Sequence, residues 1–461
     1  MSGIVNALNL AKSGLLTGQK ALEIAGNNIS NVNTPGYSRE VPVFTAFPSL
    51  MIQGVMVGTG SGISNISREH DDFLTKQIQD KNASLGAESG KTEQLTEVEN
   101  VIGVSDNSLG AQIDNFFGAW QALSGDPGNQ IARTNVLDSG SKLAAGFSSA
   151  VASLQSVQSN LDVSLVAKVG DINAKLKQVA SLNQTIAGIE AGGPTALSAR
   201  DQRDVLLKDI SYALGGSSIE SAGGMVSYYL PSGLPLVQDG DAFSLSMTKT
   251  SGVSSLQLNL GTQSISLSTE KVGGEIHGML AVRDQIIPDL VNNLDKLAYN
   301  LANQVNSAHQ LGSGLDGVAG RDFFTPPAQQ AGAAAALGVA LTSYNQVAAG
   351  LSSATGDNSN ALNISALGGA KAIDGSYTFS GYYSQVATDV GSEVSSNKTA
   401  VTGNQDSLDL ISNLRDNTVG VSIEEEMVSL ISYQKSFEAS AKYLTVVNEM
   451  LSSLLNMGGT V

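Results

Sequence analysis

The chain contains no cysteine among its 461 residues, so it cannot form a disulfide, a thiolate metal site or a cysteine nucleophile. Aromatic residues make up only 5% of the sequence and charged residues only 15%, whereas glycine occurs 50 times. A chain rich in small residues builds thin cores, and this length is too great for one core. We therefore expect roughly two to four elongated domains rather than a compact enzyme body.

Clusters of basic residues and long apolar runs are also missing. The formal net charge is −17, and nucleic-acid binding requires clustered Lys and Arg, so the charge argues against a nucleic-acid partner. The longest apolar run, residues 331–341, is too short to span a bilayer. Residues 1–30 lack the basic cluster and the continuous apolar core of a cleaved signal peptide. These features alone predict a cytosolic protein without a membrane span.

Motifs for catalysis or ligand binding are scarce as well. The three histidines lie far apart, outside any metal-ligand spacing: His70, His277 and His309. Asp71 and Asp72 follow His70, but aspartates at a helix start are more commonly caps than metal ligands. Residues 312–317 match G-x-G-x-x-G, but they follow a predicted helix rather than a strand, which argues against dinucleotide binding. We therefore expect no enzyme activity, no cofactor and no metal.

Heptad patterns occupy both ends of the chain. In the N-terminal segment, apolar or small residues alternate at spacings of four and three, which predicts a coiled-coil-like helix. They are Ile4, Leu8, Ala11, Leu15, Gly18, Leu22, Ala25, Ile29 and Val32. The C-terminal segment has a seam with a seven-residue spacing: Ile423, Leu430, Phe437, Leu444 and Leu451. A second seam lies between its members: Met427, Gln434, Ala441, Asn448 and Leu455. Each helix can bury its apolar face against the other or against further copies of the chain.

A proline–glycine pair ends the N-terminal helix. The residue before Pro35 is excluded from the helical region, and Gly36 is suited to the left-handed position of a type II turn. Gly14, Gly18 and Gly26 weaken the preceding helix, because each costs about 1 kcal/mol relative to alanine. We expect residues 1–35 and 425–461 to be largely disordered in the dilute monomer and to fold on assembly.

Between the two ends, the sequence predicts a helical bundle interrupted by a β module. Helices are expected at 72–102, 108–123, from about 129 to 165, 172–189, 197–213, 275–310 and from 377 onward. Residues 54–64 indicate a flexible or tightly turning connection, and 333–350 a short β segment. Alternating apolar residues in 217–272 predict an antiparallel module. The domains are expected at 1–69 with 415–461 (terminal helical core), 70–213 with 275–414 (bundle) and 214–274 (β-rich outer domain).

Two terminal motifs resemble those of the bacterial flagellar rod/hook axial protein family. Asn27–Arg39 reads NNISNVNTPGYSR, similar to the family's N-terminal motif, and residues 424–457 are similar to its C-terminal helix. Internal runs are typical of its hook–filament junction members: Tyr37–Arg39, Phe116–Leu123, Arg200–Arg203 with Leu206 and Leu207, Arg283–Gln285 with Pro288, Asp322–Phe324, and Gly356–Asn358 with Asn360 and Ala361. The resemblance covers most of the chain and is weakest in 217–272.

The resemblance implies a mainly α protein with an inserted β module, terminal coiled-coil-like helices and an elongated bundle. It implies a structural subunit that forms an adaptor ring at the hook tip through its terminal helices, exported by the flagellar type III route without a cleaved signal peptide. The implied partners are copies of the chain, the hook protein, the second hook–filament junction protein and an export chaperone.

Two groups of residues are central to this interpretation. The motif turn consists of Asn27, Asn28, Asn31, Thr34, Pro35, Gly36 and Tyr37. The assembly seam consists of Leu8, Leu15, Leu22, Ile29, Leu430, Phe437, Leu444 and Leu451. Two alternatives stay open: another axial protein, such as a hook or distal rod subunit, and a secreted protein with a binding or hydrolase activity in the β module. The second alternative requires convergent polar residues in 217–272, which offers mainly Ser, Thr and scattered Asp.

Overall fold

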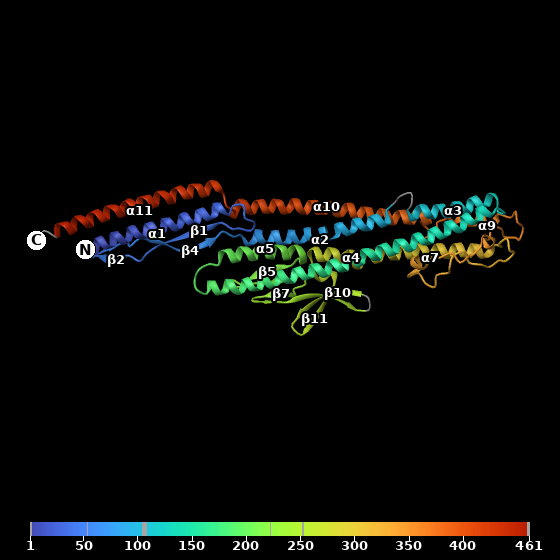
Figure 1. The fold of residues 1–461 in the computed structure, drawn as a ribbon, viewed down its shortest axis with the longest axis horizontal. Coiled ribbons are helices and arrows are strands. Elements are labelled where there is room, and N and C mark those ends of the chain that lie inside the picture. Colours follow the sequence, from blue (N-terminus) through green and yellow to red (C-terminus); the bar gives the residue numbers. More distant parts are fainter. Residues whose placement is uncertain (1, 53, 104–107, 222, 251–252, 459–461) are drawn as a thin grey trace.

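The molecule is long and narrow, with both termini at one end of its long axis (Figure 1). The computed structural model describes residues 2–52, 54–103, 108–221, 223–250 and 253–458. Its helices are α1 Ser2–Ser30, α2 Asp72–Ile102, α3 Leu109–Gly125, α4 Gln130–Glu190, α5 Leu197–Leu214, α6 Gly274–Ala281, α7 Ile287–Leu311, α8 Ala333–Ala336, α9 Ser359–Leu367, α10 Phe379–Val419 and α11 Ile423–Gly458. Shorter helical turns are η1 Thr269–Lys271, η2 Val282–Ile286 and η3 Tyr344–Gln346.

The strands form four small antiparallel sheets. They are β1 Glu40–Ala46, β2 Leu50–Ile52, β3 Val55–Val57, β4 Ser61–Arg68, β5 Ser217–Glu220, β6 Val226–Tyr229, β7 Pro235–Gln238, β8 Asp241–Ala242, β9 Ser244–Thr250, β10 Val253–Leu260 and β11 Gln263–Leu267. The sheet orders are β1-β4, β2-β3, β5-β6-β7-β8 and β11-β10-β9. The prediction of a mainly α fold with an inserted antiparallel module is confirmed.

The segment after the N-terminal helix is more regular than the sequence suggests. Residues 54–64, expected to be a flexible or tightly turning connection, include β3 and the beginning of β4, which pairs with β1 from Ser61 to Arg68. The segment does turn tightly, but the expectation missed its strands, because most of the glycines lie outside the strands. Gly54 and Gly60 have φ values of +82° and +111°. Gly54 lies where the chain reverses between the paired strands β2 and β3, and Gly60 lies between β3 and β4.

The middle of the molecule is the expected helical bundle. Asp71 caps α2 by accepting a hydrogen bond from the Leu74 amide at 2.9 Å, which confirms the capping interpretation. The two helices expected at 129–165 and 172–189 are one helix, α4, of 61 residues. The division was wrong because Leu165, Val169 and Ile172 continue the buried stripe without interruption. α4 therefore links the far end of the bundle to the β module along one continuous element (Figure 1).

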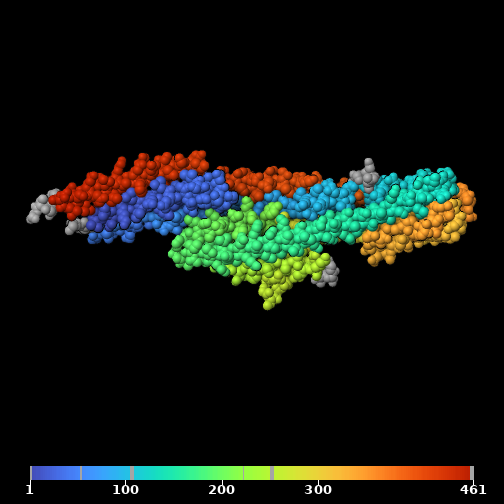
Figure 2. All heavy atoms as spheres, viewed as in Figure 1, coloured from blue at the N-terminus to red at the C-terminus, as the bar shows by residue number. Residues whose placement is uncertain are grey.

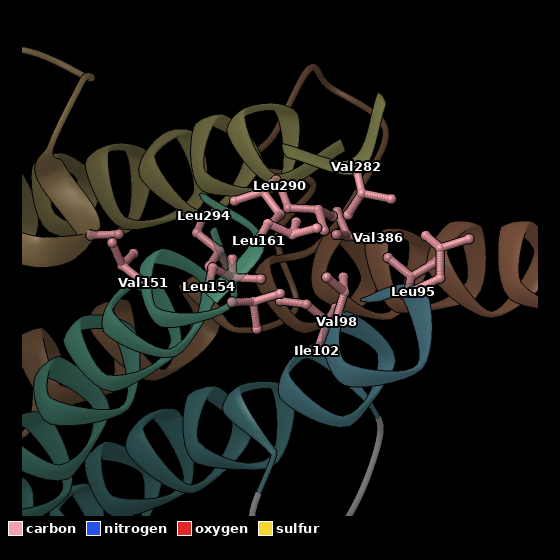
Figure 3. Close-up of a cluster of buried hydrophobic side chains, with 14 of the residues drawn as sticks. Leu95, Val98, Ile102, Val151, Leu154, Leu161, Val282, Leu290, Leu294 and Val386 are labelled. Carbon is pink, nitrogen blue, oxygen red and sulfur yellow. The ribbon is translucent and has the colours of Figure 1, made fainter. Parts of the chain in front are cut away.

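One hydrophobic core runs through the bundle and into the β module. In its middle section, α2, α4, α7 and α10 bring their apolar side chains together (Figure 3). At the end far from the termini the core is aromatic: Phe116, Trp120, Phe323 and Phe324 form a cluster with ring centroids 4.8–6.5 Å apart in the contacting pairs. Edge-to-face packing of this kind stabilises beyond the buried area alone.

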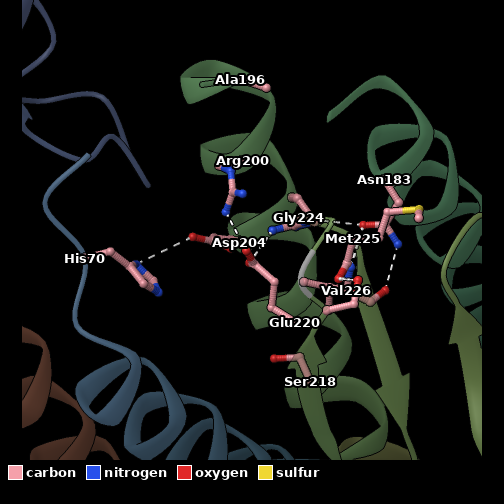
Figure 4. Close-up of polar contacts among 12 residues, drawn as sticks. His70, Asn183, Ala196, Arg200, Asp204, Ser218, Glu220, Gly224, Met225 and Val226 are labelled. Carbon is pink, nitrogen blue, oxygen red and sulfur yellow. Dashed lines mark hydrogen bonds and ion pairs between the residues drawn. The ribbon is translucent and has the colours of Figure 1, made fainter. Parts of the chain in front are cut away.

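The β module is attached to α4 and α5 by buried polar side chains. Asn183 of α4 donates hydrogen bonds to the carbonyl oxygens of Val226 and Asp239, and Arg203 of α5 donates to that of Gly224 at 2.6 Å (Figure 4). Arg200 forms ion pairs with Glu190 and Glu220. The arginines in the 200–203 run therefore join the bundle to the module.

Two further segments after α7 differ from or refine the sequence expectations. Residues 333–350 contain α8 and η3 rather than a β segment, with only isolated bridges from Val339 and Gly350. The run of alanines there favours a helical turn. Residues 312–317 form a turn after α7, and Asp316 pairs with Arg321 at 2.6 Å. No helix in the described part of the chain is long and apolar enough to cross a membrane.

Glycines allow α2 to approach its neighbours closely. A Cβ at buried Gly86 would collide with the Tyr212 carbonyl oxygen of α5 and lie 3.1 Å from the Glu275 nitrogen of α6, whereas a Cβ at exposed Gly170 of α4 would meet nothing within 4 Å. We expect Gly86→Ala to lower the free energy of unfolding by about 1–3 kcal/mol through overpacking. Gly170→Ala should raise it by about 0.4–1 kcal/mol. Thermal unfolding followed by circular dichroism checks both predictions. Equal shifts of the unfolding midpoint in the two variants would contradict the close packing at Gly86.

Candidate functional site

The terminal helices α1 and α11 lie side by side at the end of the molecule that carries both termini (Figure 1). Small side chains set their distance, since a Cβ added at Gly18 would lie 3.3 Å from the Cα of Phe437. The buried apolar side chains of the two helices are few and mostly small: Ala11, Ala21, Ile24, Ala25 and Val447. Neither helix contributes to the hydrophobic core clusters found among the described residues.

The predicted seam is only partly covered within one chain. All eight assembly-seam residues are half-buried: Leu8, Leu15, Leu22, Ile29, Leu430, Phe437, Leu444 and Leu451. The alternate C-terminal seam is more open, because Met427, Gln434, Asn448 and Leu455 are exposed. In α1 most of the deeply buried apolar positions are small, such as Ala11 and Ala25. The pair therefore buries its small residues and leaves much of its large apolar surface in solvent.

Exposed apolar side chains gather in this region. Residues 1–69 and 415–461 make up about a quarter of the chain, but they hold more than half of the large hydrophobic side chains that the described structure exposes. Those on α11 include Val428, Ile431, Val446, Met450 and Leu454. Exposed apolar surface on this scale marks a region that contacts another molecule. We therefore treat the terminal pair and its β segment as the candidate functional site.

The proline–glycine turn at the end of α1 has the predicted geometry. The Tyr37 amide donates to the Thr34 carbonyl oxygen at 3.1 Å, and Gly36 has φ +81°, as a type II turn requires. A Cβ at Gly36 would also collide with Val205 on α5. The type II turn is thus confirmed, and it directs the chain from α1 back along the helix pair as β1.

Polar residues of the motif hold the last turn of α1 and the chain that follows it. Asn31 donates to the carbonyl and side-chain oxygens of Asn27, at 3.0 and 2.9 Å, and accepts from the Thr34 hydroxyl at 3.1 Å. Asn27 also donates to the Tyr37 hydroxyl at 3.3 Å. These side chains satisfy groups that the helix terminus would leave without partners.

Asn28 is the buried centre of the turn, with 1% of its surface exposed. Its amide donates to the Glu40 carbonyl oxygen at 2.8 Å and to the Glu426 carboxylate at 3.2 Å. Its oxygen accepts from the Tyr37 hydroxyl at 2.8 Å and from the Glu40 amide at 3.0 Å. All hydrogen-bonding positions of this amide are used across three segments of the chain, which explains why an asparagine suits the site.

A buried ion pair joins the turn to the start of α11. Arg39 Nε donates to Glu426 at 2.7 Å, and a second nitrogen donates to Glu425 at 3.0 Å. Burial acts to lower the pKa of Arg39, but its hydrogen bond to Glu426 and the nearby carboxylates outweigh burial and raise that pKa. The three glutamates at 424–426 lie in the first turn of α11, where negative charge is favourable at a helix N-terminus. Their pairing with Arg39 was not apparent from the sequence, because the two segments are almost 400 residues apart.

The turn and β4 also dock on α5 of the bundle. Asp201 accepts from the Ser38 amide at 3.2 Å and pairs with Arg68 at 3.0 Å. Arg68 pairs with Asp204 at 2.6 Å, and His70 lies 4.0 Å from the same carboxylate (Figure 4). Burial raises the pKa of the Asp201 carboxyl. Since Asp201 and Arg68 lie in two parts of the sequence with no shared pattern, sequence reasoning missed this contact.

In the described part of the site, no arrangement of side chains matches a known catalytic pattern. Within the described residues, no group of three or more His, Asp or Glu side chains is placed to hold a metal ion. The open space of about 840 Å³ between the turn and the helices α4 and α5 is lined by the motif turn, Gln178, Ser198 and Gln202, among others. Its polar groups belong mainly to the hydrogen-bond network of the turn. This network joins the turn to α5 and to the start of α11.

Three family models match separate parts of the sequence. Residues 8–37 match "Flagella basal body rod protein", and residues 416–457 match "Flagellar basal body rod FlgEFG protein C-terminal". Residues 95–324 match "Flagellar hook-associated protein FlgK helical domain". The first two matches cover the terminal helices, and the third covers most of the bundle and the β module. The fold and the terminal site are those of a flagellar axial protein.

Similarity to whole proteins narrows this class. Flagellar hook-associated protein 1 of Bacillus subtilis (strain 168) is 29% identical over 99% of both chains. The protein of that name from Escherichia coli (strain K12) is 30% identical over 69% of this chain and 59% of its own length. The chain belongs to the flagellar hook-associated protein 1 family. The fold is also similar to that of the flagellar hook junction protein FlgK from Burkholderia pseudomallei, with a TM-score of 0.67 and 15% identity over 75% of this chain and 100% of that chain.

Replacing Gly36 tests the turn. We expect Gly36→Val to cost about 1–2 kcal/mol locally, the penalty for a side chain in left-handed backbone. The collision with Val205 adds to this cost and redirects the chain from Tyr37 onward, so the variant should fail to support filament attachment. Gly26→Val, at a helical glycine with open space around its Cα, is the matched control. Normal motility of cells that carry the Gly36→Val chain would contradict the assigned role of the turn in assembly.

Proposed function

We propose that this chain is a structural subunit of the flagellar junction between hook and filament, where it assembles with copies of itself through α1 and α11. The observation that carries the proposal is the terminal pair: its core is thin, and large apolar side chains remain exposed along it. Surface of this kind is stabilised when a neighbouring molecule covers it. The family to which the chain belongs supplies the setting, a flagellar assembly.

The proposed arrangement places the terminal core domain, residues 1–69 and 415–461, at the axis of an adaptor ring at the hook tip. The bundle, 70–213 and 275–414, would form the next shell, and the β module, 214–274, would face outward. The proposed partners are further copies, the hook protein, the second hook–filament junction protein and an export chaperone. The proposed location is the outside of the cell, reached by the flagellar export route.

The family is structural, and we propose that the chain has no enzymatic activity. The contacts of the β module with the bundle support this view, because buried polar side chains of α4 and α5 are occupied in binding its backbone. Asn183 and Arg203 bond to its backbone, and the Tyr228 hydroxyl donates to the Gly215 carbonyl oxygen at 2.6 Å. Electron microscopy of a strain lacking the gene gives the overall test: hooks without filaments are expected, whereas normal filaments would contradict the proposed role.

Truncating the seam tests the assembly surface. Leu22 and Leu444 are half-buried in the single chain, and we propose that assembly buries them fully. Leu22→Ala or Leu444→Ala should then cost about 2–5 kcal/mol in the assembled state. Lys20→Ala is the control, because Lys20 lies on the same helix with 53% of its side chain exposed. The measurement is the amount of each variant at isolated hook tips. Equal incorporation of the Leu22→Ala and Lys20→Ala chains would refute the proposal that assembly buries the seam.

Hydrogen exchange of the free chain tests the expectation that the ends fold on assembly. The pairing of α1 with α11 buries few large side chains, and helical stability depends mostly on such packing. We expect fast exchange at Leu15–Ile29 in a verified monomer and slow exchange in 130–210, where the bundle core is continuous. Slow exchange in both segments would instead establish a stable helical pair before assembly.

A further inference from the structure

The hairpin formed by β2 and β3 has apolar side chains on both faces and no strand partner beyond itself in the described structure. Met51 lies opposite Met56 in the ladder, so both side chains project from one face. Leu50 and Val55, each one position away, project from the other face. The exposed fractions of these four residues are 72%, 61%, 55% and 64%, in the order named.

A two-stranded hairpin with three residues in each strand is at best marginally stable alone in water. This hairpin nevertheless has a fixed base. The Thr59 hydroxyl donates to the Pro48 carbonyl oxygen at 2.9 Å, the Phe47 amide to that of Gly60 at 2.9 Å, and Asn6 of α1 to that of Gly58 at 3.3 Å. The base is therefore attached to α1, while the apolar tip projects without cover. Exposed apolar surface of this kind marks a site of contact with another molecule.

The charge pattern limits the kind of partner. Residues 41–67 contain no Lys, Arg, Asp or Glu, in a chain whose formal net charge is −17. The tips of the terminal helices are similar: residues 2–11 have no charge, and residues 443–458 have only Glu449. Two acidic copies repel each other over most of their surfaces, but this repulsion is weakest where both surfaces lack charge.

The tip of the helix pair offers a matching groove. A cavity of about 480 Å³ is lined by Ile4 of α1 and by Val446, Met450 and Leu454 of α11, with Glu449 and Ser453 at its polar side. Val446, Met450 and Leu454 are all exposed within the single chain. The groove and the hairpin are therefore both unoccupied by their own chain, and unbranched methionine side chains adapt well to an irregular apolar groove.

Rings of more than two copies that are built head to tail require two different, complementary surfaces on each subunit, one for each neighbour. We propose that the β2–β3 hairpin of one copy seats Met51 and Met56 in the groove between the tips of α1 and α11 of a second copy. The proposal rests on the proposed function and specifies its partner contact: the hairpin is the projecting surface and the helix tips are the receiving one. The second face of the hairpin, with Leu50 and Val55, is covered by the same neighbour.

Cysteine cross-linking tests this contact directly, because the natural chain has no cysteine. Full-length Met51→Cys and Met450→Cys chains are co-expressed, assembled on hooks in a strain lacking the natural chain, and oxidised. A cross-linked dimer on a non-reducing gel is expected for this pair. The control pair is Met51→Cys with Val163→Cys, because Val163 is an exposed apolar residue on α4 of the bundle, and it should give no dimer.

A charged variant provides a second measurement. We expect Met51→Asp with Met56→Asp to reduce the amount of chain at hook tips by at least about tenfold, because assembly would bury two unpaired charges. The thermal unfolding of the bundle should not change. Ser153→Asp with Ser156→Asp, at exposed positions of α4, is the matched control and should assemble normally.

The outcomes separate the two proposals. Chains that occupy hook tips and support filaments, but form no Met51–Met450 dimer, overturn the hairpin contact and leave the junction role intact. Undiminished assembly of the doubly charged variant also overturns the hairpin contact. Failure of the unaltered chain to occupy hook tips overturns the junction role and the hairpin contact together.

Discussion

A buried contact between residues 28 and 426 holds the two ends of this long chain together. Asn28 bonds to Glu426, and Arg39 pairs with the same carboxylate at 2.7 Å. Leaving a buried carboxylate unpaired is costly, so the three groups stabilise one another only when the motif turn and the start of α11 are in place. The position of α11 beside α1, and with it the whole terminal domain, depends on this small network.

The terminal domain differs from the bundle in where it places its large apolar side chains. In the bundle they are inside, in a core that continues from the aromatic cluster around Trp120 to the β module. In the terminal pair the inside is filled mainly by small residues, while residues such as Ile431 and Met450 remain outside. The space-filling view shows how narrow the molecule is along its length (Figure 2). The bundle thus buries its own large apolar side chains, whereas the terminal pair leaves many of them in solvent.

Local features of the fold were predictable from the sequence. The type II turn follows from the φ preference of Gly36, and the start of α2 follows from the capping ability of Asp71, because each depends on neighbouring residues alone. The continuity of α4 was missed at 165–172 because tertiary packing, rather than local propensity, maintains the helix there. The β2–β3 hairpin was missed because the glycines of 54–64 indicated a flexible or tightly turning connection and gave no sign of the short strands beside them.

The polar contacts of the candidate site were the least predictable part. The glutamates at 424–426 and the arginine–aspartate run at 200–203 were visible in the sequence, but nothing local indicates which residues they meet. Asp201 lies on α5 of the bundle, and it contacts Arg68 and Ser38 of the terminal segment, which are more than 100 residues away in the sequence. Such long-range pairs can be identified only from the three-dimensional structure, whereas helices and turns can be predicted from the local sequence.

Hydroxyl-radical footprinting is the most direct test that the terminal pair is the assembly surface. Oxidation of Met427 and Met450, both exposed on α11, would be compared between the free chain and chains attached to hooks, with exposed Val163 and Val166 of α4 as internal references. The account predicts that attachment protects the two methionines and leaves the two valines as reactive as before. Equal oxidation of Met427 and Met450 in the free and attached states would contradict it.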